Sequence, residues 1–271
     1  AGGMVVKNVT GYDMGKLYTG SLGTLGVIVE ANFKLLPLPA VEETIVGLFE
    51  EFSGSRAAID ALIDSVLMPN SVEILDDTAA SVVLGDSITA DRTILVRFGG
   101  RHEAVARQIS DTQKMFFECG AQTQEFSGEE QTDLWEAFAR LNEYPSDVCA
   151  ARCRASVLSS KVEVVFAKAQ AIASETNLEV AIWGRAFDGL IHVVFCGDRD
   201  KCLADAIESL RAEINAISGS LVVEACSVEV KHRTDIWGST ADPGAIRIMK
   251  AIKHKFDPQD IMNPGRFTHG I

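Results

Sequence analysis

Residues 178–196 read LEVAIWGRAFDGLIHVVFC. Two short apolar runs, 178–183 and 190–196, flank the dipeptide Asp188-Gly189, which is a strong signal for a tight turn between strands. The stretch therefore predicts an antiparallel hairpin. Amphipathic helical patterns lie on either side of it, and strand patterns lie beyond them; the helices are predicted at 159–173 and 203–217 and the strands at 148–154 and 220–225.

The order strand, helix, strand, strand, helix, strand is predicted a second time before this unit. Its strands are expected at 44–52, 72–75, 93–98 and 122–126, its helices at 55–67 and 102–119, and a helical connector at 129–142. Asp76 and Asp77 are expected to be solvated loop acids. Two such units predict an α+β fold, a duplicated ferredoxin-like antiparallel sheet with helices on one face.

Shorter segments with different patterns flank this region. Residues 27–29 and 33–36 are apolar and predict strands, which Pro37 and Pro39 would end. At the other end, Asp242-Pro243 predicts a helix start, with Asp as N-cap and Pro in the first turn. The sequence thus predicts three parts, 1–40, 41–240 and 241–271.

Composition excludes several classes of protein. The chain has 271 residues and a net charge of −13, with its basic residues scattered, so binding to nucleic acid is not expected. No signal peptide is recognisable, and no apolar run of about 20 residues predicts a membrane span. Three disulfides are possible among the cysteines, but reduced thiols are predicted; the cysteines are Cys119, Cys149, Cys153, Cys196, Cys202 and Cys226.

The segment most suggestive of a ligand is Gly20-Ser21-Leu22-Gly23-Thr24-Leu25-Gly26. Glycine lacks a Cβ, so its backbone N–H can approach a phosphate or a planar ring closely. A tight turn without a ligand explains the same pattern equally well. The segment matches neither the G-x-G-x-x-G dinucleotide fingerprint nor a P-loop.

Both ends of the chain resemble one family. The run from Lys7 through Gly20–Ile28 to Pro39 resembles the end of the FAD-binding domain in FAD-linked oxidases of the vanillyl-alcohol-oxidase type. The tail Phe256-Asp257-Pro258 with Asn263-Pro264-Gly265-Arg266 resembles their C-terminal signature. Within that family, the resemblance is to glycolate oxidase subunits of the E type, which bind FAD. The middle of the chain matches only in layout.

The resemblance implies a cofactor site and a division into domains. FAD would contact the glycine-rich segment and the tail; the residues are Ser21, Gly23, Thr24, Leu25, Gly26, Val27, Ile28 and Asn263. Residues 1–40 would be the C-terminal part of the FAD-binding domain, 41–240 the cap (substrate) domain, and 241–271 a segment that returns to the FAD domain. Nothing matches the family's N-terminal pyrophosphate loop. The chain is therefore expected to be a C-terminal portion that by itself binds FAD weakly or not at all.

The resemblance also implies an activity. The protein would oxidise a 2-hydroxy acid, glycolate to glyoxylate, through the flavin. Its partners would be a D-type flavoprotein subunit and an iron–sulfur subunit, in the cytoplasm or peripherally at the inner membrane through those subunits. Two alternatives remain open, a non-catalytic assembly subunit and a stand-alone FAD-linked dehydrogenase of the D-lactate type.

The chain departs from the D-type relatives at their metal-binding run. Where they have two histidines, residues 184–192 retain only His192 and carry Arg185 in place of the other. Their later Glu-His pair is expected near 229–233 and is missing there. The sequence therefore predicts no metal site. Substrate-side candidates are Arg185, His192 and His232. Each has a structural alternative: a surface ion pair with Asp188 for Arg185, a packed imidazole for His192, and a place in a solvated run of charges for His232.

Overall fold

The computed structural model describes residues 3, 11–85, 90–145, 150–238 and 242–271. The chain forms two compact units. One consists of Pro39–Gly238, and the other of Ala1–Leu38 together with Ser239–Ile271. Each unit is described by itself.

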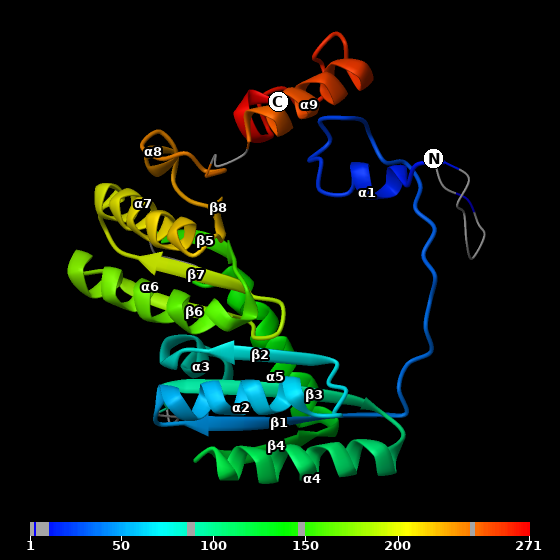
Figure 1. Cartoon of the computed structure of the whole chain (residues 1–271), viewed down its shortest axis with the longest axis vertical. Helices are drawn as coiled ribbons and strands as arrows, with labels where there is room; N and C mark the ends of the chain where they lie inside the picture. The colour runs from blue at the N-terminus through cyan, green and yellow to red at the C-terminus, as the bar shows by residue number, and fades with distance from the viewer. Residues whose placement is uncertain (1–2, 4–10, 86–89, 146–149, 239–241) are drawn as a thin grey trace. The chain divides into compact units, whose positions relative to one another are not determined.

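The larger unit contains two copies of one arrangement, joined by the helix α5 (Gly128–Arg140) (Figure 1). The first copy consists of β1 (Val41–Phe49), α2 (Phe52–Asp64), β2 (Ser71–Leu75), α3 (Asp77–Leu84), β3 (Arg92–Gly100), α4 (His102–Glu118) and β4 (Gln122–Ser127). The second consists of β5 (Ala150–Ser156), α6 (Val162–Thr176), β6 (Glu179–Arg185), β7 (Leu190–Cys196), α7 (Asp200–Ala216) and β8 (Ser220–Ala225), followed by the short helix α8 (Val228–Lys231).

All eight strands form one sheet, in the order β4-β1-β3-β2-β6-β7-β5-β8. Every pairing is antiparallel, and the strand order of the second copy repeats that of the first in reverse. The α+β fold built on a duplicated antiparallel sheet is thus confirmed. Several predicted strand ends are off by a few residues, and Val148 and Cys149 lie outside the described residues.

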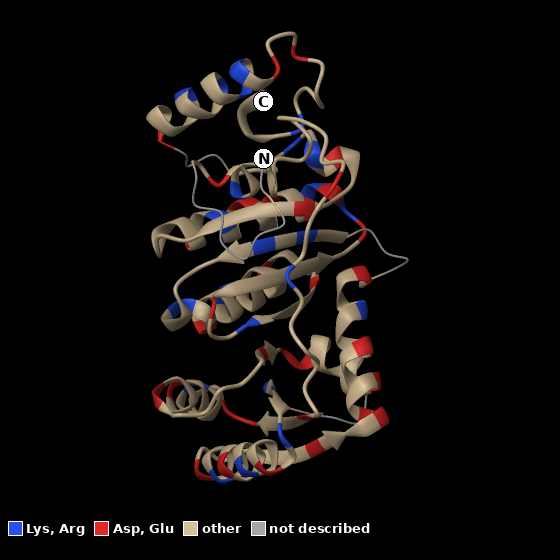
Figure 2. Cartoon of the chain, turned by 90° about the vertical axis from the view of Figure 1, so that its right-hand side faces the viewer, with Lys and Arg blue, Asp and Glu red and all other residues tan. Residues whose placement is uncertain are grey.

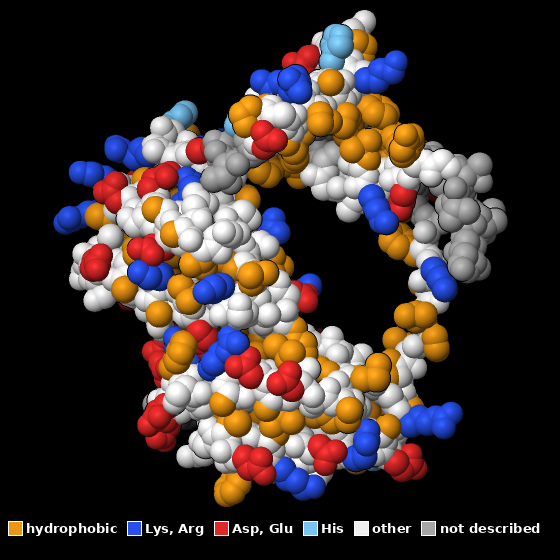
Figure 3. All heavy atoms as spheres, in the orientation of Figure 1, with side chains coloured by type: hydrophobic (Ala, Val, Ile, Leu, Met, Phe, Trp, Pro, Cys, Tyr) orange, Lys and Arg blue, Asp and Glu red, His pale blue; other side chains and the backbone are white. Residues whose placement is uncertain are grey.

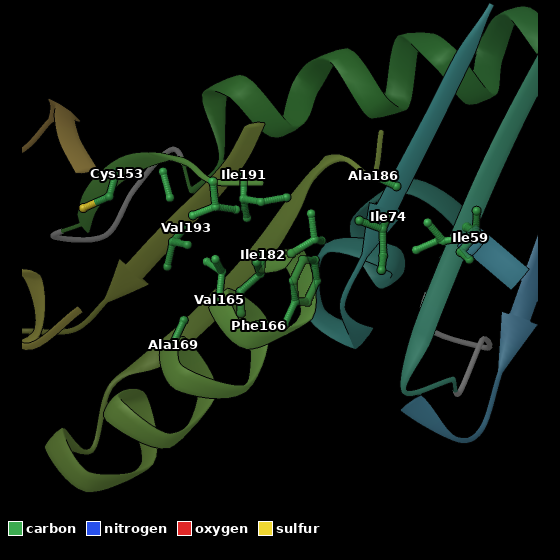
Figure 4. Close-up of a cluster of buried hydrophobic side chains, with 14 of the residues drawn as sticks. Ile59, Ile74, Cys153, Val165, Phe166, Ala169, Ile182, Ala186, Ile191 and Val193 are labelled. Carbon is green, nitrogen blue, oxygen red and sulfur yellow. The ribbon is translucent and has the colours of Figure 1, made fainter. Parts of the chain in front are cut away.

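Helices cover both faces of the sheet. On the first face, α2, α4, α6 and α7 bury one apolar cluster to which both copies contribute, including Ile59 and Ile74 from one and Phe166, Ile182 and Ile191 from the other (Figure 4). On the second face, α3 and α5 cover a smaller cluster. Figure 1 shows α2 and α6 in front of the sheet and α5 behind it. The prediction that helices cover one face of the sheet was therefore incomplete, because α3 and α5 cover the other face.

The helix α3 was not predicted from the sequence. Asp76 is its N-cap: the side chain is fully buried, and its Oδ1 accepts a hydrogen bond of 2.8 Å from the N–H of Ala79. The expectation that Asp76 is a solvated loop acid is therefore wrong. The helix has only eight residues, three of them small and adjacent, so its apolar residues show too little periodicity to predict a helix. The N-cap residue Asp76 was the one feature of the sequence that indicated it.

A buried ion pair ties the two copies together. Nε of Arg92, the first residue of β3, lies 3.5 Å from Oε2 of Glu163 on α6, and both side chains are almost fully buried. The hydroxyl of Ser55 on α2 donates to Oε1 of Glu163 at 3.1 Å. The guanidinium of Arg92 also lies 4.9 Å from the ring centroid of Phe166. Helices of both copies thus meet around one carboxylate.

The smaller unit contains α1 (Met14–Tyr18) and α9 (Pro243–Phe256). Asp242 caps α9 as predicted, since its side chain accepts from the N–H of Gly244. Residues 27–29 and 33–36 are not strands. A strand exists only when a neighbouring strand accepts and donates its backbone hydrogen bonds, and the described part of this unit contains no other strand.

We expect Arg92→Leu to lower the free energy of unfolding by about 3–5 kcal/mol, because it leaves Glu163 buried without a counter-ion. Urea unfolding of the chain would measure this. The matched control is Arg56→Leu, which breaks the more exposed ion pair with Asp60 and should cost less than about 1 kcal/mol. Equal losses in the two variants would contradict the structural role of the buried pair.

We also expect Asp76 to make stability depend on pH. Burial raises the pKa of Asp76 from 3.8 to about 7, outweighing the hydrogen bonds from the backbone. The folded state therefore binds more protons, so this contribution to stability is complete below pH ~4 and is lost as the pH rises through ~7.

The test is Asp76→Asn, which retains the cap but cannot titrate. Relative to this variant, the wild-type chain should lose up to about 4 kcal/mol of unfolding free energy between pH 4 and 8. Asp77→Asn, at an exposed position next to it, is the control. A difference between wild type and Asp76→Asn that does not change with pH would refute the prediction.

Candidate functional site

The glycine-rich segment forms a tight turn in the smaller unit. Leu22 and Gly23 both have positive φ, 52° and 74°. Thr24 is buried, and its hydroxyl and N–H both donate to the carbonyl of Ser21, at 2.8 and 3.0 Å. A Cβ on Gly23 would lie 2.8 Å from Nδ2 of Asn263, so only glycine fits there without a shift.

The C-terminal tail returns to this turn. Nδ2 of Asn263 donates to the carbonyl oxygen of Leu22 at 2.7 Å. Turn and tail together enclose a hollow of about 660 Å³. Six of the eight residues predicted to bind the cofactor line it, namely Ser21, Gly23, Gly26, Val27, Ile28 and Asn263, whereas Thr24 and Leu25 do not. Within the described part of the chain, the N–H groups of Gly26, Val27 and Ile28 have no hydrogen-bond partner.

Lys253 of α9 holds turn and tail together, a role that the sequence analysis missed. Its buried ammonium donates to the carbonyl of Thr24 at 2.9 Å, to the carbonyl of Met262 at 2.8 Å and to Oδ2 of Asp257 at 2.6 Å. Burial alone would lower the pKa of Lys253, but hydrogen bonds with Asp257 and Asp260 raise it above the usual value. The lysine therefore stays charged where it contacts three separate segments.

Asp257 completes this cluster. It accepts from the N–H groups of Ile261 and Met262 at 3.1 and 2.8 Å, which fixes the turn that leads into the tail. The hydrogen bond from Lys253 holds the pKa of Asp257 below its usual value. The family signature Phe256-Asp257-Pro258 thus has a structural explanation, because Asp257 joins the helix end to the tail.

The segment that follows the turn exposes a series of apolar side chains. Five of them are at least 80% exposed, and Figure 3 shows apolar side chains along this part of the chain; the five are Val29, Phe33, Leu35, Leu36 and Leu38. Apolar residues at such density are normally buried. Their burial would require a partner surface that the described residues of this unit do not supply.

The second candidate region is the second face of the sheet in the larger unit, where β2, β6, β7, β5 and β8 carry polar side chains. Arg185 of β6 pairs in register with Glu73 of β2, and His192 of β7 lies between Trp183 and Arg154. Glu73 is buried, and burial raises its pKa although Ser71 and Arg185 act to lower it. Arg185 is exposed and lies 3.4 Å from Asp188, so the surface ion pair exists.

His192 has a neighbour that the sequence analysis did not place. Its Nδ1 lies 3.5 Å from Oε2 of Glu224 on β8, and its ring stacks on Trp183 at a centroid distance of 5.4 Å. The contact with His192 and the charge of Arg154 hold the pKa of Glu224 below its usual value. The relatives' Glu-His pair was expected near 229–233, whereas the carboxylate beside His192 is that of Glu224. His232 lies exposed at the end of α8.

These side chains do not form a site for a divalent cation. The other oxygen of Glu224 is bound by Arg154, with Nε 2.6 Å away, and Arg185 places another positive charge on the same face. No group of three or more potential ligands lies together among the residues that the structure describes. Figure 2 shows Lys and Arg interspersed with Asp and Glu over most elements, whereas α9 carries Arg247, Lys250, Lys253 and Lys255 and no acidic residue.

Comparison with known proteins identifies the family. Residues 38–267 match the model of the family described as "FAD linked oxidases, C-terminal domain". The chain belongs to this family of FAD-linked oxidases. It is 28% identical to the glycolate oxidase subunit GlcD of Bacillus subtilis, covering 98% of the chain and 59% of that protein. It is 23% identical to a probable mitochondrial D-lactate dehydrogenase of Danio rerio, covering 96% of the chain and 55% of that protein.

Solved structures support the same fold. An alkyldihydroxyacetonephosphate synthase superposes with a TM-score of 0.66 at 15% identity, over 96% of the chain and 50% of that protein. A p-cresol methylhydroxylase superposes with a TM-score of 0.64 at 16% identity, over 86% of the chain and 54% of that protein. The chain spans a little over half the length of the two curated relatives named above, 59% and 55%. None of the helices described is long and apolar enough to cross a membrane.

We expect Lys253→Met to free the tail from the turn, because it removes three hydrogen bonds and leaves Asp257 without its cation. The amides of Ile261 and Met262 should then exchange with deuterium roughly tenfold faster or more. Lys250→Met, at an exposed position on the same helix, should leave their exchange unchanged. Equal exchange in both variants would show that Lys253 does not hold the tail.

Proposed function

We propose that this chain forms the C-terminal part of an FAD-dependent oxidoreductase that oxidises a small 2-hydroxy acid. More specifically, we propose the FAD-binding E-type subunit of a glycolate oxidase, acting on glycolate beside a D-type flavoprotein subunit and an iron–sulfur subunit. The family match over residues 38–267 carries the first, broader proposal. It is supported by relatives named as a glycolate oxidase subunit, D-lactate dehydrogenases and D-2-hydroxyglutarate dehydrogenases.

The smaller unit fits a role in holding FAD. Its hollow presents free backbone N–H groups at Gly26, Val27 and Ile28, which suit a phosphate or the edge of a ring. Asn263 holds one side of the turn, and the Gly23 position has no room for a side chain. We assign the cofactor contacts to the lining residues Ser21, Gly23, Gly26, Val27, Ile28 and Asn263, with Thr24 and Leu25 supporting the turn.

The larger unit would supply the substrate side. When bound, FAD takes up the hydride equivalent from the α-carbon of a hydroxy acid. The guanidinium of Arg185 can bind a carboxylate with two parallel hydrogen bonds if it releases Asp188. His192 is the imidazole on the same face of the sheet that can accept the hydroxyl proton. His232 lies at the end of α8 and has no assigned role in this proposal.

Two other functions remain testable. Arg185 at the position of a metal-binding histidine favours an assembly subunit that has lost the chemistry. The relatives named as D-lactate dehydrogenases favour a stand-alone dehydrogenase. A cytoplasmic location, with attachment to the inner membrane through other subunits, is part of the proposal for the glycolate oxidase complex.

The decisive experiment is anaerobic reduction of the flavin in the full-length protein, purified with its partner subunits, by glycolate, D-lactate and D-2-hydroxyglutarate. We expect one of these acids to bleach the flavin absorbance. Arg185→Ala should then raise KM roughly tenfold, since a charge-assisted contact is lost, and His192→Ala should lower kcat by about 10²- to 10⁴-fold. Arg56→Ala, on the exposed side of α2, is the control. Unchanged turnover in both site variants would instead support the assembly subunit.

A further inference from the structure

Neighbouring strands restrict the position of His192 on both sides. It lies opposite Trp183 of β6 on one side and opposite Arg154 of β5 on the other. The imidazole and the Trp183 ring are nearly parallel, with 14° between their planes. The ring therefore cannot rotate freely, and its two nitrogens have different surroundings. Nδ1 is shielded from solvent, whereas the side chain as a whole is 19% exposed.

The strand β8 is irregular at Glu224. The register between β5 and β8 shifts between Arg152 and Cys153, whose partners are Ala225 and Val223, so Glu224 is an additional residue in its strand. Bulges of this kind redirect side chains and occur often beside functional sites. Across β5, Oε2 of Glu224 lies 3.5 Å from Nδ1 of His192, and Oε1 lies 2.6 Å from Nε of Arg154.

This arrangement determines which ring nitrogen carries the proton. A carboxylate oxygen facing a bare Nδ1 would place two lone pairs against each other, whereas a protonated Nδ1 faces an acceptor. Among the described residues Nδ1 forms no hydrogen bond, and the carboxylate it faces, 3.5 Å away, is that of Glu224. The neutral imidazole is thus favoured with its proton on Nδ1 and with Nε2 available as a base. Arg154 offsets the negative charge of Glu224 without occupying the imidazole.

We propose that Glu224 is a positioning residue that keeps His192 in the Nδ1-protonated tautomer, so that Nε2 accepts the hydroxyl proton of the 2-hydroxy acid without a metal ion. This inference rests on the proposed function. As the acid is oxidised, its α C–H bond breaks and a hydride equivalent leaves for FAD. The O–H proton passes to Nε2, the C–O bond becomes a carbonyl, and the imidazolium then returns the proton to solvent.

The charged groups near His192 are compatible with this role. They are Glu224 on β8, Arg154 on β5, Arg185 on β6, Asp188 in the following turn and Glu73 on β2. The two arginines would attract the substrate carboxylate toward the same face, while the carboxylate of Glu224 stabilises the imidazolium that forms. The guanidinium of Arg154 is thus the positive charge held beside His192.

The first test reads the tautomer directly and needs no substrate. Long-range ¹H–¹⁵N NMR of the ring nitrogens, on the chain with its five histidines labelled, distinguishes the two tautomers, and His192→Asn assigns the signals. We expect His192 to have its proton on Nδ1 when neutral. In Glu224→Gln and Glu224→Ala it should move toward the Nε2-protonated form. Glu213→Gln, which removes an exposed carboxylate paired with Lys168, is the matched control. An unchanged tautomer in both Glu224 variants would overturn the proposal.

The second test uses turnover of the full-length protein. Glu224→Gln should lower kcat roughly 10- to 100-fold with little change in KM. Combined with His192→Asn, it should cost no more than His192→Asn alone, because the two residues act as one unit. Additive losses, or a change in KM alone, would overturn the positioning role. Failure of every 2-hydroxy acid to reduce the wild-type flavin would instead overturn the proposed function, and the NMR result would stand apart from it.

Discussion

The pairing of β2 with β6 is the constraint on which the larger unit depends. It joins the two copies through three residue pairs, Glu73↔Arg185, Ile74↔Gly184 and Leu75↔Trp183. Two backbone hydrogen bonds extend it, from Asp76 to Ile182 and from Ala186 to Val72. Because this junction is short, the buried Arg92–Glu163 pair and the shared apolar cluster must keep the copies in register. A slip of one residue would turn Arg185 and Trp183 to the opposite face.

The same junction explains why the polar side chains of the second face are found together. Glu73 comes from one copy and Arg185 from the other, and Trp183, which stacks on His192, also borders the junction. Neither copy alone would present this combination. The duplication thus forms one eight-stranded sheet, and its central strands β2, β6 and β7 carry the charged and aromatic side chains Glu73, Arg185, Trp183 and His192.

The smaller unit depends on a different interaction. It has no sheet among its described residues, so few backbone hydrogen bonds connect its segments. The ammonium of Lys253 substitutes for them, since its donors reach the turn, the tail and the helix end at once. A charged donor suits this task because bonds to it are stronger than those between neutral groups. The exposed apolar residues 29–38 indicate that further burial is needed for this unit to reach its full stability.

Sequence patterns predicted those elements whose periodicity is long or whose turns are specific. The hairpin around Asp188-Gly189 and the helices α4 and α7 were recognised because their apolar residues repeat over many positions. The helix α3 was missed because it is short, and the strands at 27–29 and 33–36 were predicted wrongly because apolar character does not supply a pairing partner. The family resemblance implied only that the tail returns to the FAD domain; the hydrogen bond from Asn263 to Leu22 was not predicted.

Glu224 and Lys253 escaped prediction for a physical reason. A single carboxylate in a strand of ordinary composition has no local signal. Its contact with His192 crosses β5, and one sequence does not reveal that β7, β5 and β8 are neighbours. Lys253 is one of three basic residues in the last turn of α9, where cations commonly offset the helix dipole. What distinguishes it is burial, which depends on the fold. Both residues act through contacts between distant segments, and such contacts are set by how strands and helices pack.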